Sequence, residues 1–113
     1  LLELETSSAD KVVKTVPENC FVVTDAPVVL NSISNHKAIS TKYFLKNQEM
    51  FENLKTGSCI YYFYDYNCAA RELAFLARQR CDSMLNNFNL DTIAEYKSDK
   101  GSYYLYRIKD KIE

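Results

Sequence analysis

The sequence has little glycine and histidine, and both shortages limit the sites that the chain can form. Gly57 and Gly101 are its only glycines and stand alone, so the usual glycine-rich phosphate-binding loops are absent. His36 is the only histidine, and none of the four cysteines forms a C-x-x-C pair, which argues against a zinc site. We interpret His36 as a surface or hydrogen-bonded turn residue, because its neighbours Asn35 and Lys37 are polar. No metal or cofactor is therefore expected.

Long apolar runs and an excess of one sign of charge are also missing. The longest runs, such as residues 59–64, fall far short of the roughly 20 residues that a membrane-spanning helix needs. The 14 basic and 15 acidic residues leave a net charge of −1, and no cluster of Lys and Arg exceeds two or three residues. Nucleic acid is not an expected partner, because such binding depends on concentrated positive charge.

The length and composition indicate one globular domain spanning residues 1–113. The sequence is 47% hydrophobic and 26% charged, which is ordinary for a globular protein. A chain of 113 residues can bury a core without obligatory cross-links. Because it begins at Leu1 and not at Met, we expect it to be a soluble domain of a longer protein.

Short apolar strands alternate with helical patterns along most of the chain. This alternation predicts an α/β fold, a three-layer Rossmann-like sandwich with a mainly parallel sheet and a C-terminal antiparallel hairpin. The simplest strand order places the first strand between the second and the third. The expected strands are residues 20–24, 36–40 and 58–65, with the hairpin strands 90–96 and 102–108. The expected helices are residues 3–16, 25–34, 41–54 and 69–88.

Asp25 and Asp65 end the first and third strands, and Asn67 follows two residues after Asp65. In a parallel sheet these residues meet at the carboxyl edge, where open α/β sheets bind ligands. Two carboxylates there suit Mg²⁺, which prefers oxygen ligands. The favoured alternative is that Asp25, Asp65 and Asn67 cap the helices that follow. No complete catalytic motif accompanies them.

Cys20 and Cys59 open the first and third strands. Matching positions on neighbouring strands lie about 4.7–4.9 Å apart, within disulfide range, so an oxidising compartment would permit a bond. Two reduced, buried thiols are the favoured alternative. Cys81 is expected in the core, and Cys68 would lie about 20 Å from it along one helix. That pair is expected only if Cys68 stays outside the helix, and no base accompanies a Cys68 nucleophile.

Nine tyrosines are the compositional oddity. Four of them, Tyr96, Tyr103, Tyr104 and Tyr106, fall in the expected hairpin. Cross-strand packing accounts for most tyrosines in strands. Outward-facing ones suit a stacking platform for a sugar or an interaction surface for another domain.

The order of these features resembles the soluble C-terminal domain of polytopic membrane glycosyltransferases that use dolichyl- or polyprenyl-phosphate sugars, similar to protein mannosyltransferases. The resemblance covers most of the chain. It is carried by residues 16–19 (VPEN), 21–27 (FVVTDAP), 35–40 (NHKAIS), 60–63 (IYYF), 88–96 (FNLDTIAEY) and 103–108 (YYLYRI).

The resemblance implies an accessory, non-catalytic domain on the extracytoplasmic face of a membrane, where it aids substrate docking or stability. Its expected partners are the membrane-embedded portion of the parent chain and a sugar or lipid-linked sugar. In that family the catalytic acids lie elsewhere in the protein, so no catalytic residue transfers to this sequence. Two alternatives stay open: a cytoplasmic Mg²⁺-dependent phosphate-handling enzyme using Asp25 and Asp65, and an interaction domain that exposes its tyrosine-rich hairpin.

Overall fold

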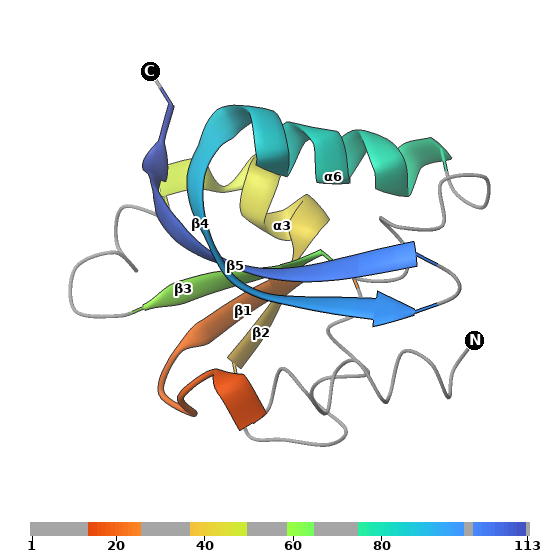
Figure 1. The fold of residues 1–113 in the computed structure, drawn as a ribbon. Coiled ribbons are helices and arrows are strands. Elements are labelled where there is room, and N and C mark those ends of the chain that lie inside the picture. The colour runs from red at the N-terminus through yellow and green to blue at the C-terminus, as the bar shows by residue number, and fades with distance from the viewer. Residues whose placement is uncertain (1–13, 26–36, 50–58, 65–74, 99–100, 113) are drawn as a thin grey trace.

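A five-stranded mixed sheet forms the centre of the molecule (Figure 1). The computed structural model describes residues 14–25, 37–49, 59–64, 75–98 and 101–112. The strand order is β2-β1-β3-β5-β4. The strands are β1 (Phe21–Thr24), β2 (Lys37–Ser40), β3 (Ile60–Tyr64), β4 (Phe88–Ser98) and β5 (Gly101–Lys111).

Strands β1, β2 and β3 run parallel, with β1 between the other two. Val22 of β1 lies opposite Ala38 on one side and Tyr61 on the other. Val22 and Val23 are both fully buried although they point to opposite faces, as expected for a parallel strand covered on both sides. The strand order predicted from the sequence is confirmed for these three strands.

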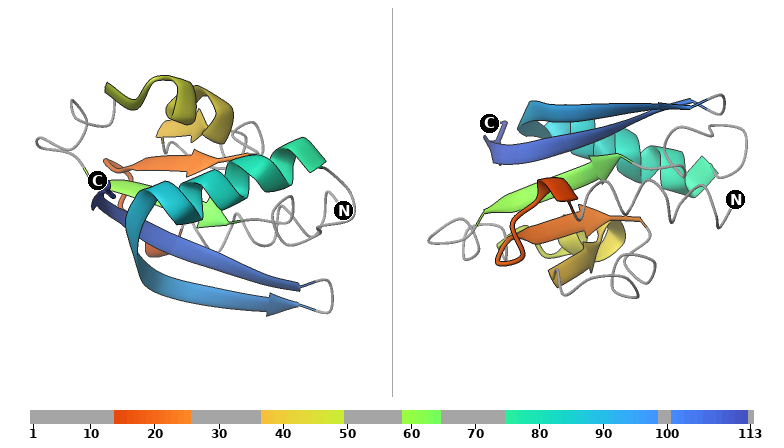
Figure 2. Two further views of the ribbon diagram at one scale, coloured as in Figure 1. Left: turned by 90° about the horizontal axis from the view of Figure 1, so that it is seen from above. Right: turned by 60° about the horizontal axis from the view of Figure 1, so that its bottom comes forward.

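Strands β4 and β5 form a long antiparallel hairpin, and β5 also pairs antiparallel with β3. The hairpin extends beyond the parallel strands (Figures 1 and 2). Its register shifts between Asn89 and Leu90, and again between Thr92 and Ala94, so that Ile93 has no partner on β5. Such bulges bend a strand and change which side chains share a face.

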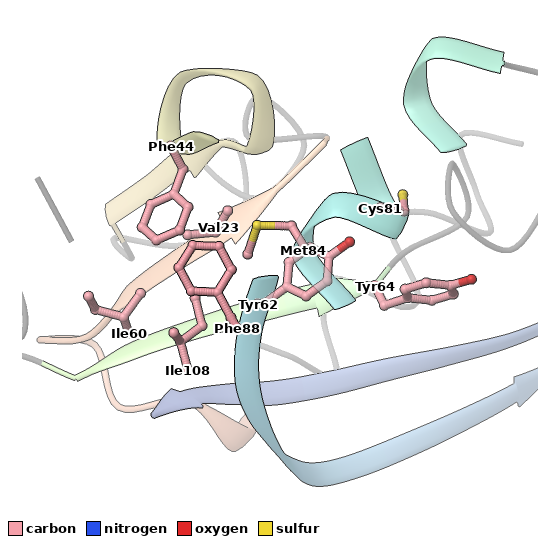
Figure 3. Close-up of a cluster of buried hydrophobic side chains, with 9 residues drawn as sticks. All are labelled: Val23, Phe44, Ile60, Tyr62, Tyr64, Cys81, Met84, Phe88 and Ile108. Atoms are coloured by element: carbon pink, nitrogen blue, oxygen red, sulfur yellow. The ribbon is translucent and has the colours of Figure 1, made fainter. Parts of the chain in front are cut away.

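Two described helices cover the same face of the sheet. Helix α3 (Thr41–Lys46) begins where the Ser40 side chain accepts a hydrogen bond from the Tyr43 backbone N–H, as helix-capping serines do. Helix α6 (Phe75–Asn87) lies beside α3 (Figure 1). The buried cluster between these helices and the sheet (Figure 3) consists of Val23, Phe44, Ile60, Tyr62, Tyr64, Cys81, Met84, Phe88 and Ile108.

The opposite face of the sheet is covered in part by the segment that precedes β1. Val16 and Cys20 belong to a second buried cluster, which also contains Val22, Phe63, Tyr103 and Leu105. Of the expected helix 3–16, Lys14, Thr15 and Val16 lie in the described part; the first two are helical and Val16 forms a bend. The expected helix 25–34 lies outside the described residues except for Asp25. No helix among the described residues is long and apolar enough to cross a membrane.

The predicted three-layer Rossmann-like sandwich with a mainly parallel sheet is wrong. The described chain is rich in strand, its sheet has two parallel and two antiparallel pairs of neighbours, and both described helices lie on one face. Each hairpin strand has 11 residues, whereas the described helices have 6 and 13. The sequence pattern underestimated the hairpin because its polar ends, such as Asn89 and Asp110, are ordered by cross-strand pairing and not by apolar alternation.

Candidate functional site

Asp25 follows β1 at the carboxyl edge of the parallel strands, and its carboxylate is held by a cation from the same chain. The Arg80 side chain of α6 donates from Nε to Asp25 Oδ1 over 3.3 Å. The Asp25 side chain is only 4% exposed and that of Arg80 is 31% exposed. Asp25 therefore joins the end of β1 to α6, and it presents little surface to a ligand.

The other two residues of the predicted carboxylate site, Asp65 and Asn67, lie outside the described residues. Within the described ranges no group of three His, Cys, Asp or Glu side chains is placed to hold a metal ion. The ion pair with Arg80 also occupies Asp25, which the Mg²⁺ interpretation needs as a ligand. In the described part of the chain, the carboxyl edge of the sheet is thus a structural contact.

Cys20 and Cys59 form a disulfide at the opposite end of the same strands. Their Cα atoms are 4.9 Å apart, and the Phe21 backbone N–H donates to the Cys59 carbonyl over 2.9 Å. Of the two interpretations offered by the sequence, reduced thiols or a bond, the structure has the bond. Cys81 is buried and also disulfide-bonded, and its partner lies outside the described residues, as does Cys68. No described cysteine is a free thiol.

The four hairpin tyrosines do not form one surface, because they alternate between the two faces of the sheet. Tyr103 is 1% exposed in the core cluster that contains Cys20. Tyr96 packs against that cluster, and its hydroxyl lies 3.2 Å from Thr15 Oγ1. Tyr104 and Tyr106 pack on the other face, beside the core of α3 and α6. These last two belong to a continuous aromatic group on that face.

That group, the tyrosine cluster, consists of Tyr62 and Tyr64 on β3 with Tyr104 and Tyr106 on β5. The rings of Tyr62 and Tyr106 are stacked with their centroids 6.1 Å apart, and those of Tyr104 and Tyr106 are stacked at 5.7 Å. Tyr64 meets Tyr104 edge to face at 5.7 Å. The β3 members are buried and the β5 members are half-buried. Solvent therefore reaches the cluster on its β5 side.

Polar groups of β4 flank the exposed side of the tyrosine cluster. Thr92 lies opposite Tyr106 and Glu95 opposite Tyr104, and both β4 residues are exposed. Burial raises the pKa of Tyr106, and the nearby Tyr104, Tyr64 and Glu95 raise that pKa further by charge repulsion. The phenol of Tyr106 thus shares its surroundings with two other phenols and a carboxylate.

Sequence reasoning missed Thr92 and Glu95. They are three residues apart, so a regular strand would place them on opposite faces. The bulge at Ile93 brings both to the side of Tyr104 and Tyr106. The pattern of the sequence contains no glycine or other turn residue at this position that would have revealed the shift.

Comparison of the chain with protein-family models, with curated proteins and with solved structures found no match.

Proposed function

We propose that this chain is an extracytoplasmic, non-catalytic module of a membrane glycosyltransferase that uses a lipid-linked sugar. The observation that carries the location is the oxidised state of its cysteines. Cys20 and Cys59 are bonded to each other, and Cys81 is disulfide-bonded as well. Disulfides persist in extracellular and periplasmic spaces and are rare in the reducing cytosol.

An accessory role is supported by the way in which the described polar groups are used. Asp25 is covered and paired with Arg80, so it serves stability and not acid–base chemistry. The exposed ion pair of Lys109 with Asp91, at 3.6 Å, is a surface contact of the hairpin. The link to a glycosyltransferase comes from the resemblance of the six sequence segments named above.

Thiol labelling of the full-length protein in intact cells tests the location. Tyr43 is 51% exposed on α3, so the variant Tyr43→Cys presents an accessible thiol that does not disturb the core. A membrane-impermeant maleimide is expected to label this variant from the extracytoplasmic side, in intact cells or, for a luminal domain, once the internal membranes are opened. Residues 1–113 of the wild-type chain should stay unlabelled until a reductant is added. Labelling that appears as soon as the plasma membrane alone is permeabilised, with internal membranes closed, would place the domain in the cytoplasm and contradict the proposal.

The parent enzyme is tested separately by the full reading frame. Several apolar segments of about 20 residues are expected in the parent chain outside residues 1–113, because the proposed catalytic portion is embedded in the membrane. A soluble catalytic domain in their place would refute the link to a membrane glycosyltransferase. The disulfide and the labelling result would remain valid in that case.

A further inference from the structure

We propose that the exposed side of the tyrosine cluster binds a neutral saccharide, with Tyr104 as the aromatic contact and Glu95, Thr92 and the Tyr106 hydroxyl as hydrogen-bonding groups. This site deepens the proposed function, since it gives the accessory module a ligand. It rests, however, on the geometry of β4 and β5 and can be tested on the chain alone.

The aromatic part of the site is fixed before any ligand arrives. Tyr106 is stacked between Tyr62 and Tyr104, with interplanar angles of 15° and 22°. The fully buried Tyr62 anchors this row to the core (Figure 3). A rigid tyrosine loses little conformational entropy when it contacts a ligand. The half-buried Tyr104, held by its contact with Tyr106, therefore provides preorganised aromatic surface.

The polar part of the site matches the hydroxyl groups of a sugar. A carboxylate such as Glu95 only accepts hydrogen bonds and can accept two at once, which suits a pair of neighbouring hydroxyls. The hydroxyls of Thr92, Tyr104 and Tyr106 both donate and accept. Small-ligand sites combine aromatic surface with a few polar groups that fix orientation, and a pyranose offers both an apolar C–H face and polar edges.

The local charge favours a neutral ligand over a phosphate or a cation. Lys97 follows Glu95 two positions later on β4, so alternation places it on the same face. On this face of β4, the charges of Glu95 and Lys97 cancel in sum. Arg107 and Lys109 fall on the other face of the hairpin. There, Arg107 lies opposite Asp91 and Lys109 forms an ion pair with Asp91. A phosphate or an amine would thus lack a matching excess of charge at the tyrosines.

Titration of the 113-residue chain with uncharged glycosides tests the proposal. We would add methyl α-mannopyranoside, methyl β-glucopyranoside and maltotriose, and follow the backbone amides and saturation transfer to the sugar protons by NMR. At least one glycoside is expected to bind with a dissociation constant on the order of 1 mM, as for a small ligand on an open surface. The shifts should centre on residues 92–95 and 104–106.

Variants then distinguish the site from non-specific contact. Tyr104→Ala should weaken binding at least tenfold, and Glu95→Gln should weaken it several-fold without affecting the fold, because Glu95 is exposed. Tyr43→Ala removes an exposed tyrosine from α3 and should leave the affinity unchanged. Should Tyr104→Ala fail to fold, Glu95→Gln and Thr92→Val still decide the question.

The proposal is overturned by no response to any glycoside at 50 mM (roughly 50 times the expected constant), by shifts that map elsewhere, or by an affinity that Glu95→Gln and Tyr104→Ala leave unchanged. Tetramethylammonium that saturates the same amides when the glycosides do not would replace the saccharide with a cation. The topology of the parent protein does not enter this experiment, so its failure leaves the proposed location untouched.

Discussion

The ionisation of the Tyr106 phenol depends on the fold. Burial raises the pKa of its phenol above the ordinary value of 10.0, and Tyr104, Tyr64 and Glu95 add to the shift. The folded state therefore holds the Tyr106 proton more tightly than the unfolded state does. Its contribution to stability is complete well below pH 10 and is lost as the pH rises from that ordinary value through the raised pKa of the folded state.

We accordingly expect Tyr106→Phe to lose less stability than the wild type between pH 9 and pH 11, values that bracket the ordinary tyrosine pKa of about 10. Urea unfolding at both pH values measures the difference. Tyr43→Phe, at an exposed site on α3, is the matched control and should follow the wild type. An identical loss in Tyr106→Phe and wild type would contradict the raised pKa.

The ion pair of Asp25 with Arg80 gives a second prediction. Arg80→Met leaves the covered carboxylate of Asp25 without its donor, which is expected to cost about 2 kcal/mol of unfolding free energy. Asp25→Asn combined with Arg80→Met should cost less than Arg80→Met alone, because no unpaired charge stays buried. Urea unfolding of both variants checks the order. If the double variant is the less stable of the two, the pair does not act as described.

At the residue scale, the sequence predicted where a residue lies in its strand better than it predicted which side chain the residue contacts. It placed Asp25 at the end of a strand and Cys20 and Cys59 at matching strand positions, because strand alignment follows from local pattern. It could not find Arg80 as the partner of Asp25, since their contact spans 55 residues and depends on where α6 docks. Glu95 was hidden by the bulge at Ile93.

Helix α3 has six residues, so it depends on tertiary contacts for its stability. Phe44 is its main anchor: the side chain is fully buried and its ring lies 5.5 Å from that of Phe88. Phe44→Ala should lower the unfolding free energy by about 3–5 kcal/mol, the usual range for removing a buried aromatic ring. Denaturant unfolding measures this loss.

The neighbouring residue provides the control for that prediction. Tyr43 is 51% exposed, so Tyr43→Ala should change the unfolding free energy by no more than about 0.5 kcal/mol. Equal losses for Tyr43→Ala and Phe44→Ala would mean that α3 does not dock through the face that contains Phe44.

At the element scale, the sequence predicted which strands and helices exist more accurately than it predicted their lengths. All five strands were expected near their observed places: β-branched and aromatic runs mark four of them, whereas β2 contains only one such residue, Ile39. The described part of the expected helix 69–88 is α6, which ends at Asn87, and the expected helix 41–54 begins at Thr41 as α3 does. Both hairpin strands are longer than expected, since pairing with a neighbour orders polar residues that have no strand preference of their own.

At the scale of the whole molecule, the sheet has a parallel half and an antiparallel half, which differ in how far apart their paired strands lie in the sequence. The parallel half consists of short strands that are far apart in the sequence, and the antiparallel half is a local hairpin. The order of elements along the sequence does not give their lengths. It therefore does not show that the hairpin strands are long and the described helices are short. This is why the strand order could be predicted while the three-layer architecture was wrong.

The Cys20–Cys59 disulfide acts on the parallel half, where contacts must form between distant segments. It joins the starts of β1 and β3 across a sequence separation of 39 residues. Closing a loop of that length lowers the entropy of the unfolded chain, which in the chain-entropy account stabilises the folded state by about 4 kcal/mol. Since domains of this size are stable by only about 5–15 kcal/mol, the bond is expected to decide whether the parallel half stays folded.

The double variant Cys20→Ala with Cys59→Ala isolates this effect, whereas a reductant would also attack the disulfide of Cys81. Urea unfolding of the variant should show a loss of about 4 kcal/mol, since the unfolded chain regains the freedom that the 39-residue loop removes. Hydrogen exchange should quicken first in β1 and β2, because the hairpin retains its own local pairing. A loss below about 1 kcal/mol would mean that strand pairing and the clusters around Val22 and Val23 hold the parallel half without the covalent bond. The oxidised cysteines would then indicate the compartment of the protein and not the source of its stability.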